Sequence, residues 1–115
     1  MAVNLNECLI SGTVVGDPMF SGEGDGSWGF VQVHTTYPQM DSGGQYKDVD
    51  QIVQCVSDMD RHTNTLRKYV KNGKALTLST YYRTWEADGV QNHGLFIRKL
   101  TFASANFGQE NNYNN

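Results

Sequence analysis

Long apolar runs and a secretory leader are both missing from this sequence. No apolar segment approaches the roughly 20 residues needed to cross a bilayer, and the first residues, MAVNLNECLISG, lack the basic and apolar regions of a signal peptide. We therefore expect a cytoplasmic protein without a membrane partner. The length of 115 residues is typical of one compact domain.

Cysteine and histidine are few, and they do not form a metal motif. Cys8 and Cys55 stand apart in strand-like segments, without C-x-x-C spacing. We interpret them as buried free thiols rather than as a disulfide. The three histidines, His34, His62 and His93, lack H-x-x-x-H spacing, so a metal would have to be held by distant segments. We expect no metal and no other cofactor.

Positive charge is scarce in the first half of the chain. Residues 1–60 hold nine acids and one base, Lys47, for a net charge of −8, whereas residues 61–115 hold eight bases and three acids, for +5. The second half can therefore present a basic surface although the whole chain carries −3. The alternative is that strand pairing mixes the two halves and leaves no basic patch.

Short segments rich in Val, Leu, Ile, Thr and Tyr, separated by Gly and Asp, predict an all-β fold with one helical insertion. We expect strands at about 6–15, 27–37, 49–57, 74–85 and 93–102, with polar loops at 19–29 and 38–48. A helix is expected over 58–72, capped by Ser57 or Asp58 and ended by Gly73. Residues 1–106 should form the domain, and the polar residues 107–115 a disordered tail.

The strand at 74–85 alternates most clearly. Leu76, Leu78, Thr80 and Tyr82 should face the barrel or a neighbour, which leaves one outward row of Tyr81, Arg83 and Trp85. Neighbours in such a row are about 6.5–7 Å apart, roughly the spacing of unstacked bases, and each base stacked on a ring contributes ~1–3 kcal/mol. The alternative is that this face packs against the helix or against a second protomer.

Two stretches carry a family resemblance. KYVKNGKALTLSTYYRTWEADG resembles the helix end, apolar strand, basic and aromatic segment, and acidic turn of bacterial and phage single-stranded DNA-binding (SSB) proteins. The start, NECLISGTVVGDPMF, is similar to that of the same family, with Asn6, Gly12, Asp17 and Pro18 in matching places. The resemblance implies an OB-fold, a five-stranded barrel with one helix between strands three and four.

The resemblance also implies site residues. Trp85 matches a tryptophan of the family that stacks on a base, Arg83 matches a basic residue before it, and Tyr37 lies near another stacking position. The third expected strand, VDQIVQCVSDM, lacks the tryptophan that the family usually has there, which makes Tyr81 the candidate substitute.

We therefore predict a protein that binds single-stranded DNA (ssDNA) largely without sequence specificity and protects it during replication, recombination or repair. Rings would stack on bases, and Lys and Arg would contact phosphates. Trp28 and Phe96 have core packing as their alternative role. The predicted nucleic-acid-binding residues are Tyr37, Arg67, Lys71, Lys74, Tyr81, Arg83, Trp85, Phe96, Arg98 and Lys99.

Two other functions compete with this prediction. Asp48 and Asp50 share a strand face and could hold Mg²⁺ in a nuclease, but no Ser-His-Asp or H-x-x-x-H arrangement supports catalysis, and we expect no enzyme activity. The other alternative is an OB-fold module of the replication machinery that binds protein, with its aromatic face as an oligomer interface.

The resemblance also leads to expectations about self-association and about the recruitment of repair enzymes. Open strand edges favour a homo-oligomer, a dimer or a tetramer. The sequence stops at NNYNN, without the acidic, Phe-terminated tip by which bacterial members recruit repair enzymes. We therefore expect no such recruitment, as in a phage- or plasmid-encoded version.

Overall fold

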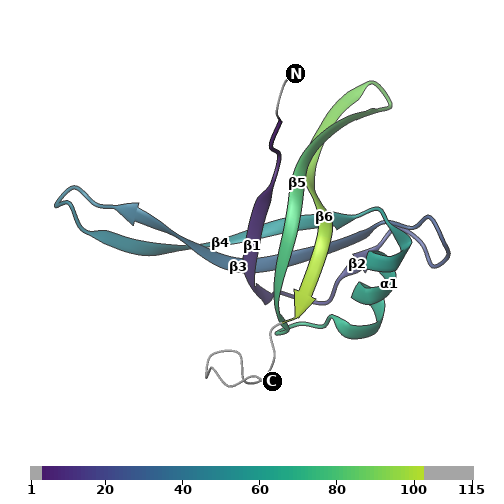
Figure 1. Ribbon diagram of the computed structural model, residues 1–115, viewed down its shortest axis with the longest axis horizontal. Helices are drawn as coiled ribbons and strands as arrows, with labels where there is room; N and C mark the ends of the chain where they lie inside the picture. Colours follow the sequence, from purple (N-terminus) through teal and green to yellow (C-terminus); the bar gives the residue numbers. More distant parts are fainter. Residues whose placement is uncertain (1–3, 103–115) are drawn as a thin grey trace.

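The strands of this protein form a single sheet that closes into a barrel (Figure 1). The computed structural model describes residues 4–102. The elements in chain order are β1 (Cys8–Val14), β2 (Met19–Phe20), β3 (Gly29–Met40), β4 (Tyr46–Ser57), α1 (Asp60–Tyr69), β5 (Ala75–Ala87) and β6 (Val90–Phe102). The strand order is β1-β5-β6-β4-β3-β2, and the pairing of β1 with β3 closes the barrel.

The predicted fold class, a five-stranded barrel with one helix, is confirmed. The five long strands are β1, β3, β4, β5 and β6. The two-residue strand β2 was not predicted; it lies in an expected loop and pairs with the start of β3. The helix therefore lies between β4 and β5, which are the third and fourth long strands. No helix within residues 4–102 is long and apolar enough to cross a membrane.

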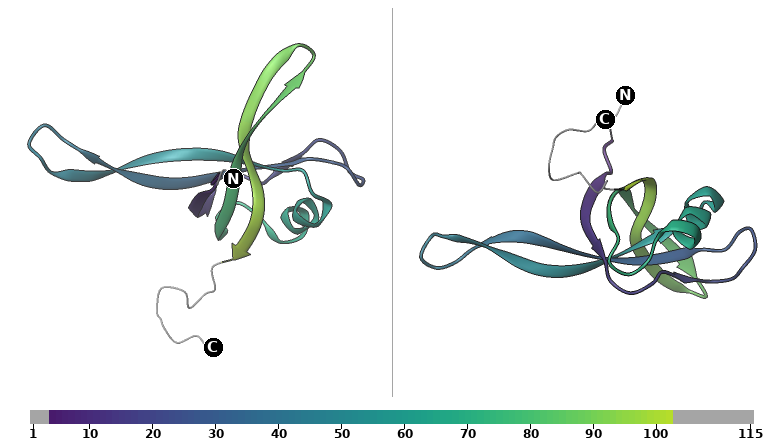
Figure 2. Two further views of the ribbon diagram at one scale, coloured as in Figure 1. Left: turned by 45° about the horizontal axis from the view of Figure 1, so that its top comes forward. Right: turned by 90° about the horizontal axis from the view of Figure 1, so that it is seen from below.

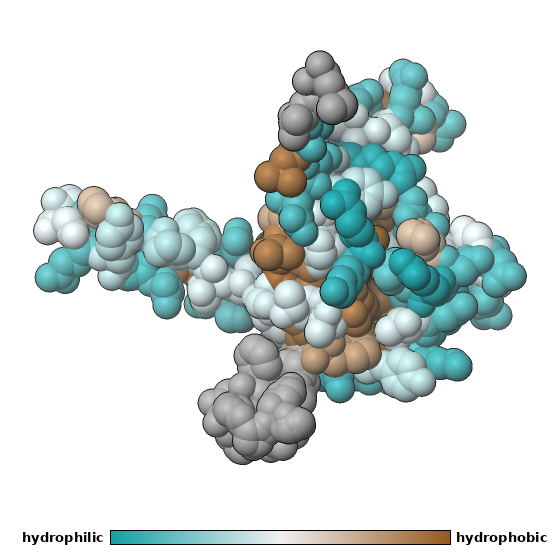
Figure 3. Space-filling model, in the orientation of Figure 1, coloured by the Kyte–Doolittle hydropathy of each residue, from teal (hydrophilic) through white to brown (hydrophobic). Residues whose placement is uncertain are grey.

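The polar segment 38–48 is not the loop that we predicted. β3 and β4 pair continuously as far as Met40 and Tyr46, so that they project from the barrel as a two-stranded arm, residues 36–50 (Figure 2). Asp41 makes the tight turn at its tip, because its carboxylate accepts hydrogen bonds from the backbone N–H of Gly43 and of Gln45, both at 2.9 Å. The surface of the arm is largely hydrophilic (Figure 3).

The helix is shorter than predicted, and its expected caps have other partners. Met59 is the N-cap and makes no side-chain capping bond. The hydroxyl of Ser57 instead pairs with that of Thr63 at 2.8 Å, and Asp58 pairs with an arginine of β5. The helix ends at Tyr69, and Gly73 follows in a turn with a φ of 92°.

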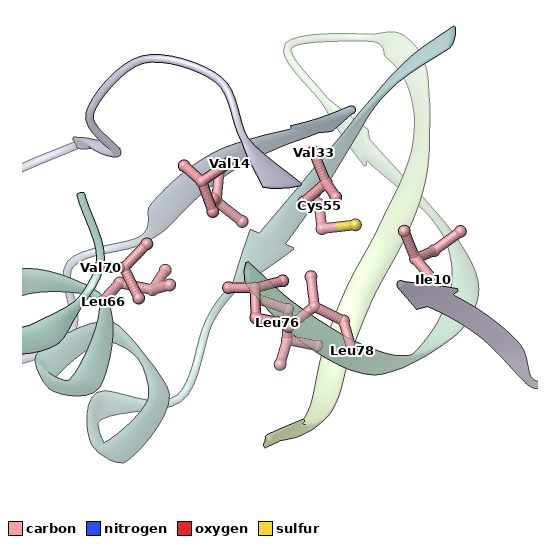
Figure 4. Packing of buried hydrophobic residues seen from close by; sticks show 10 residues of the cluster. Ile10, Val14, Val33, Cys55, Leu66, Val70, Leu76 and Leu78 are labelled. Carbon is pink, nitrogen blue, oxygen red and sulfur yellow. The ribbon is translucent and has the colours of Figure 1, made fainter. Parts of the chain in front are cut away.

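The barrel core is aliphatic (Figure 4). As predicted, Leu76, Leu78 and Thr80 of β5 are buried. Tyr82 is half exposed, so it does not pack in the barrel: β5 has left the barrel here, and the Tyr82 ring packs on that of His93 at 5.9 Å. The core cluster consists of Ile10, Val14, Val31, Val33, Cys55, Leu66, Val70, Leu76, Leu78 and Ile97.

Both cysteines are free thiols, as predicted, but Cys8 is only partly buried, so its predicted burial is wrong. Cys55 is fully buried, and burial raises the pKa of its thiol to about 12. Such a thiol stays protonated and unreactive at neutral pH.

The residues of the N-terminal motif have structural roles. The side chain of Asn6 exchanges two hydrogen bonds with the backbone of Tyr82, at 2.6 and 2.8 Å, and so continues the pairing of β1 with β5. Asp17 accepts a hydrogen bond from the backbone N–H of Asn72. A Cβ on Gly12 would lie 2.0 Å from the carbonyl oxygen of His34, because β1 crosses β3 closely where the barrel closes.

We predict that Gly12→Ala lowers the free energy of unfolding by about 2–3 kcal/mol, because the backbone of β3 must move to admit the methyl group. Gly24→Ala is the matched control, since a Cβ there meets nothing within 4 Å, and it should change stability by less than about 0.5 kcal/mol. Chemical denaturation followed by circular dichroism measures both. Equal stability of the two variants would contradict the close crossing.

Candidate nucleic-acid interface

Five aromatic rings gather outside the barrel core. We call Trp28, Phe30, Tyr81, Trp85 and Phe96 the aromatic cluster; they come from the residue before β3, from β3, from β5 and from β6. The ring of Phe96 is fully buried at the centre. Trp28 and Trp85 meet it edge-on at centroid distances of 5.5 and 5.3 Å, and Tyr81 lies 6.0 Å away. The other four rings are half-buried.

A β-bulge places Phe96 in this cluster. Ser79 of β5 pairs with Lys99, but Thr80 pairs with Ile97, so Arg98 is an extra residue in β6. The insertion shifts the alternation of β6, which turns Ile97 into the core and Phe96 outward. On the other side, β4 pairs with β6 in parallel and sets Val56 beside Phe96.

Arg83 is held inside the cluster. Its guanidinium lies 4.3 Å from the centroid of Phe96 and forms an ion pair with Asp58 at 2.5 Å. The hydrogen bond to Asp58 raises the pKa of Arg83. The arginine predicted to contact a phosphate therefore already has a carboxylate partner, and it fixes the segment before α1 against the rings.

An uncharged groove runs beside the cluster, between the end of β5–β6 and the β3–β4 pair. It offers rings for stacking, and the amides of Gln54 and Asn92 can bond to base edges. Within residues 4–102, no Asp, Glu, Lys or Arg belongs to the lining. The lining residues are Phe30, Gln54, Val56, Tyr82, Trp85, Asn92, His93, Gly94 and Leu95.

The structure brings together only part of the predicted site. Tyr81, Arg83 and Trp85 face outward on β5 as predicted, and the guanidinium of Arg98 lies 4.9 Å from the Tyr81 ring. Lys99 is exposed next to Arg98. The prediction that Phe96 contacts DNA is wrong. Its side chain has no exposed surface, so it supports the other rings and cannot itself stack on a base in this arrangement.

The remaining predicted residues lie elsewhere. Arg67 donates a hydrogen bond to the carbonyl of Gly22 and packs over the ring of Phe20. Lys74 packs over Phe102 at the opposite end of β5, and Lys71 is exposed in the turn after α1. Tyr37 is exposed on the arm.

Sequence reasoning undervalued Trp28 and missed Phe30. Their spacing of two residues at the start of a strand was the available signal, because it places both rings on one face. Nothing in the sequence marked Gln54 and Asn92 as site residues, since isolated amide side chains on strands are common.

The fold is that of an OB-fold protein. No family model and no curated protein matches the sequence. Among solved structures, the chain is similar to that described as the Plasmodium falciparum SSB complex with ssDNA, with a TM-score of 0.69 and 17% identity over 90% of this chain and 99% of that one. It is also similar to the wild-type single-stranded DNA-binding protein of Thermus aquaticus, with a TM-score of 0.70 and 17% identity over 90% of this chain and 52% of that one.

A third similar structure is the small single-stranded DNA-binding protein of Streptomyces coelicolor, with a TM-score of 0.56 and 15% identity over 87% of this chain and 95% of that one. The chain spans about half the length of the T. aquaticus protein and nearly all of the other two. The barrel is thus an SSB-like OB-fold, which agrees with the resemblance in the sequence.

We predict that Asp58 and Arg83 are coupled in stability. Asp58→Ala and Arg83→Ala in a double-mutant cycle should show a coupling free energy of about 1 kcal/mol, since the two side chains are only 20% and 35% exposed. The more exposed pair His34 and Asp50 serves as the control and should show less than about 0.5 kcal/mol. Urea denaturation of each cycle measures the coupling, and additive effects at Asp58 and Arg83 would contradict a positioning role.

Proposed function

We propose that this protein binds single-stranded DNA largely without sequence specificity, by stacking bases on the aromatic cluster. The observation that carries the proposal is the packing of Trp28, Tyr81 and Trp85 around one buried ring, with part of each ring open to solvent. Rings fixed in this way lose little side-chain freedom on binding, so the free energy of stacking is retained. Protection of ssDNA during replication, recombination or repair is the role that such binding supports.

The charge distribution supports stacking at the centre and phosphate contacts at the edge. The groove beside the cluster is lined by uncharged residues and one histidine. Arg98 and Lys99 are exposed beside Tyr81, where they can contact the backbone of a strand whose bases lie on the rings. Every base has a flat face, so such a surface tolerates any sequence.

Binding without catalysis is also proposed. The two acids considered for a nuclease, Asp48 and Asp50, are exposed on the arm, and Asp50 pairs with His34 at 3.0 Å. Within residues 4–102, no group of three or more His, Cys, Asp or Glu side chains could hold a metal ion. Incubation of labelled ssDNA with Mg²⁺ tests this part directly, because a binder shifts the mobility of the DNA and leaves its length unchanged.

We predict that poly(dT) quenches the tryptophan fluorescence and that Trp85→Ala weakens ssDNA binding by about 1–3 kcal/mol, roughly a 5- to 150-fold loss of affinity. Tyr69→Ala is the control: this ring is exposed on α1 and lines neither the cluster nor the groove. Fluorescence titration at two salt concentrations measures both. An absence of quenching, or of a salt dependence, would refute the proposed function.

Self-association is proposed through β1. This strand pairs with β5 along its length but with β3 only through Thr13 and Val14, so much of its other edge is open within the part of the chain that is described. Leu5 and Leu9 are exposed along it, and Figure 3 shows apolar surface there. An open edge with apolar side chains is suited to pairing with a second copy.

We predict that Leu9→Gln lowers the mass measured by light scattering toward that of one chain of 12.9 kDa. Met19→Gln is the control, because Met19 is equally exposed but lies on β2. If Trp85→Ala dissociates the assembly and Leu9→Gln does not, the aromatic cluster is the interface, and the alternative of a protein-binding OB-fold module is favoured.

A further inference from the structure

A second groove, of about 690 Å³, lies between α1 and the β5–β6 pair. The helix contributes Arg61, His62 and Thr65 to its wall. The remaining lining residues come from the chain just before β1, from β5 and from β6: Glu7, Ser79, Arg98, Lys99, Leu100 and Phe102. It is distinct from the uncharged groove, with which it shares no residue.

The groove is basic in a protein that is acidic overall. Arg61, Arg98 and Lys99 are exposed, and within residues 4–102 none of them has a carboxylate partner within salt-bridge distance. Among the described residues that line the groove, Glu7 is the one acid, and it accepts a hydrogen bond from the hydroxyl of Ser79 at 2.9 Å. Three cations against one acid leave a net positive wall, which suits a polyanion.

The geometry of the groove is fixed by a buried histidine. The Nε2 atom of His62 lies 3.1 Å from the backbone carbonyl oxygen of Arg98, and this contact joins α1 to the bulge in β6. Burial lowers the pKa of His62, so the ring stays neutral and can donate to that carbonyl. Arg61 and Arg98 are thereby held on opposite walls.

The basic groove continues the aromatic cluster. Arg98 lines the groove and also lies over the Tyr81 ring at 4.9 Å. On β5, Ser79 is the next outward residue after Trp85, Arg83 and Tyr81, at a spacing of about 6.5–7 Å per pair of residues. This distance is close to that between nucleotides in extended single-stranded DNA. A DNA strand whose bases stack on the rings from Trp85 to Tyr81 therefore reaches the groove with its next nucleotides.

We infer that the basic groove binds the phosphate backbone of the ssDNA that leaves the aromatic cluster at Tyr81, and that Arg61 is a binding residue for it. The inference rests on the proposed function and extends it, because it gives the bound strand a path along β5 and adds a helix residue to the site. It follows that affinity depends on length: a short oligonucleotide occupies the cluster alone, and a longer one occupies both.

The test compares oligo(dT) of about 5 and about 15 nucleotides, near the two ends of the range of OB-fold site sizes. The variant Arg61→Ala should lose about fivefold in affinity for the longer oligonucleotide. It should also show a slope of log affinity against log salt that is smaller by about 0.7, the value for one phosphate contact on a single strand. Binding of the shorter one should stay unchanged, because Arg61 lies on α1 and outside the aromatic cluster. The Arg61 side chain is exposed, so the fold should persist.

Two further variants sharpen the result. Glu7→Gln should strengthen binding of the longer oligonucleotide, because it removes the one acid of the groove. Lys68→Ala, on the same helix but outside the lining, is the charge-matched control and should change affinity less than twofold.

The outcomes separate the inference from the function on which it rests. If Arg61→Ala loses as much affinity for the shorter oligonucleotide as for the longer one, or if Lys68→Ala loses as much as Arg61→Ala, the effect is one of general charge. Either result would overturn the inferred path of the DNA into the basic groove and leave ssDNA binding in place. If the unaltered protein binds neither oligonucleotide, the proposed function fails and the inference fails with it.

Discussion

One extra residue in β6 decides which side chains face the core and which face the candidate site. With Arg98 bulged out, Ile97 fills the barrel while Phe96 turns outward, where three half-exposed rings pack around it. Without the bulge the alternation would reverse, so that Phe96 would enter the core and the rings would lose their support. The same insertion exposes Arg98 and Lys99 side by side. Core, ring support and flanking charge thus depend on a single irregularity in backbone pairing.

The strict alternation of β5 made its two faces predictable, and the orientation of Tyr81 and Trp85 followed from it. The bulge was not predictable, because no glycine or other local signal marks Arg98. The partner of Arg83, Asp58, lies 25 residues away in the chain, and only the closed barrel brings them together. The arm was interpreted as a loop because the alternation signal requires one buried face, and the arm has none.

The N-terminal residues that carry the family resemblance hold the barrel together and lie outside the candidate site. Asn6, Gly12 and Asp17 hold β1 and the turn after α1 in place, and each does so through backbone contacts. Contacts of this kind depend on few side chains, and the barrel of solved SSB structures is present here at only 15–17% identity.

The arm that extends β3 and β4 beyond the barrel differs from the barrel in what stabilises it. Its two strands bury almost no side chain, so main-chain hydrogen bonds and one turn hold it together. Opening it therefore costs little free energy compared with unfolding the barrel, and its amide protons should exchange with solvent early. The arm can lengthen, shorten or change sequence during evolution with little effect on folding, which leaves it free to diversify.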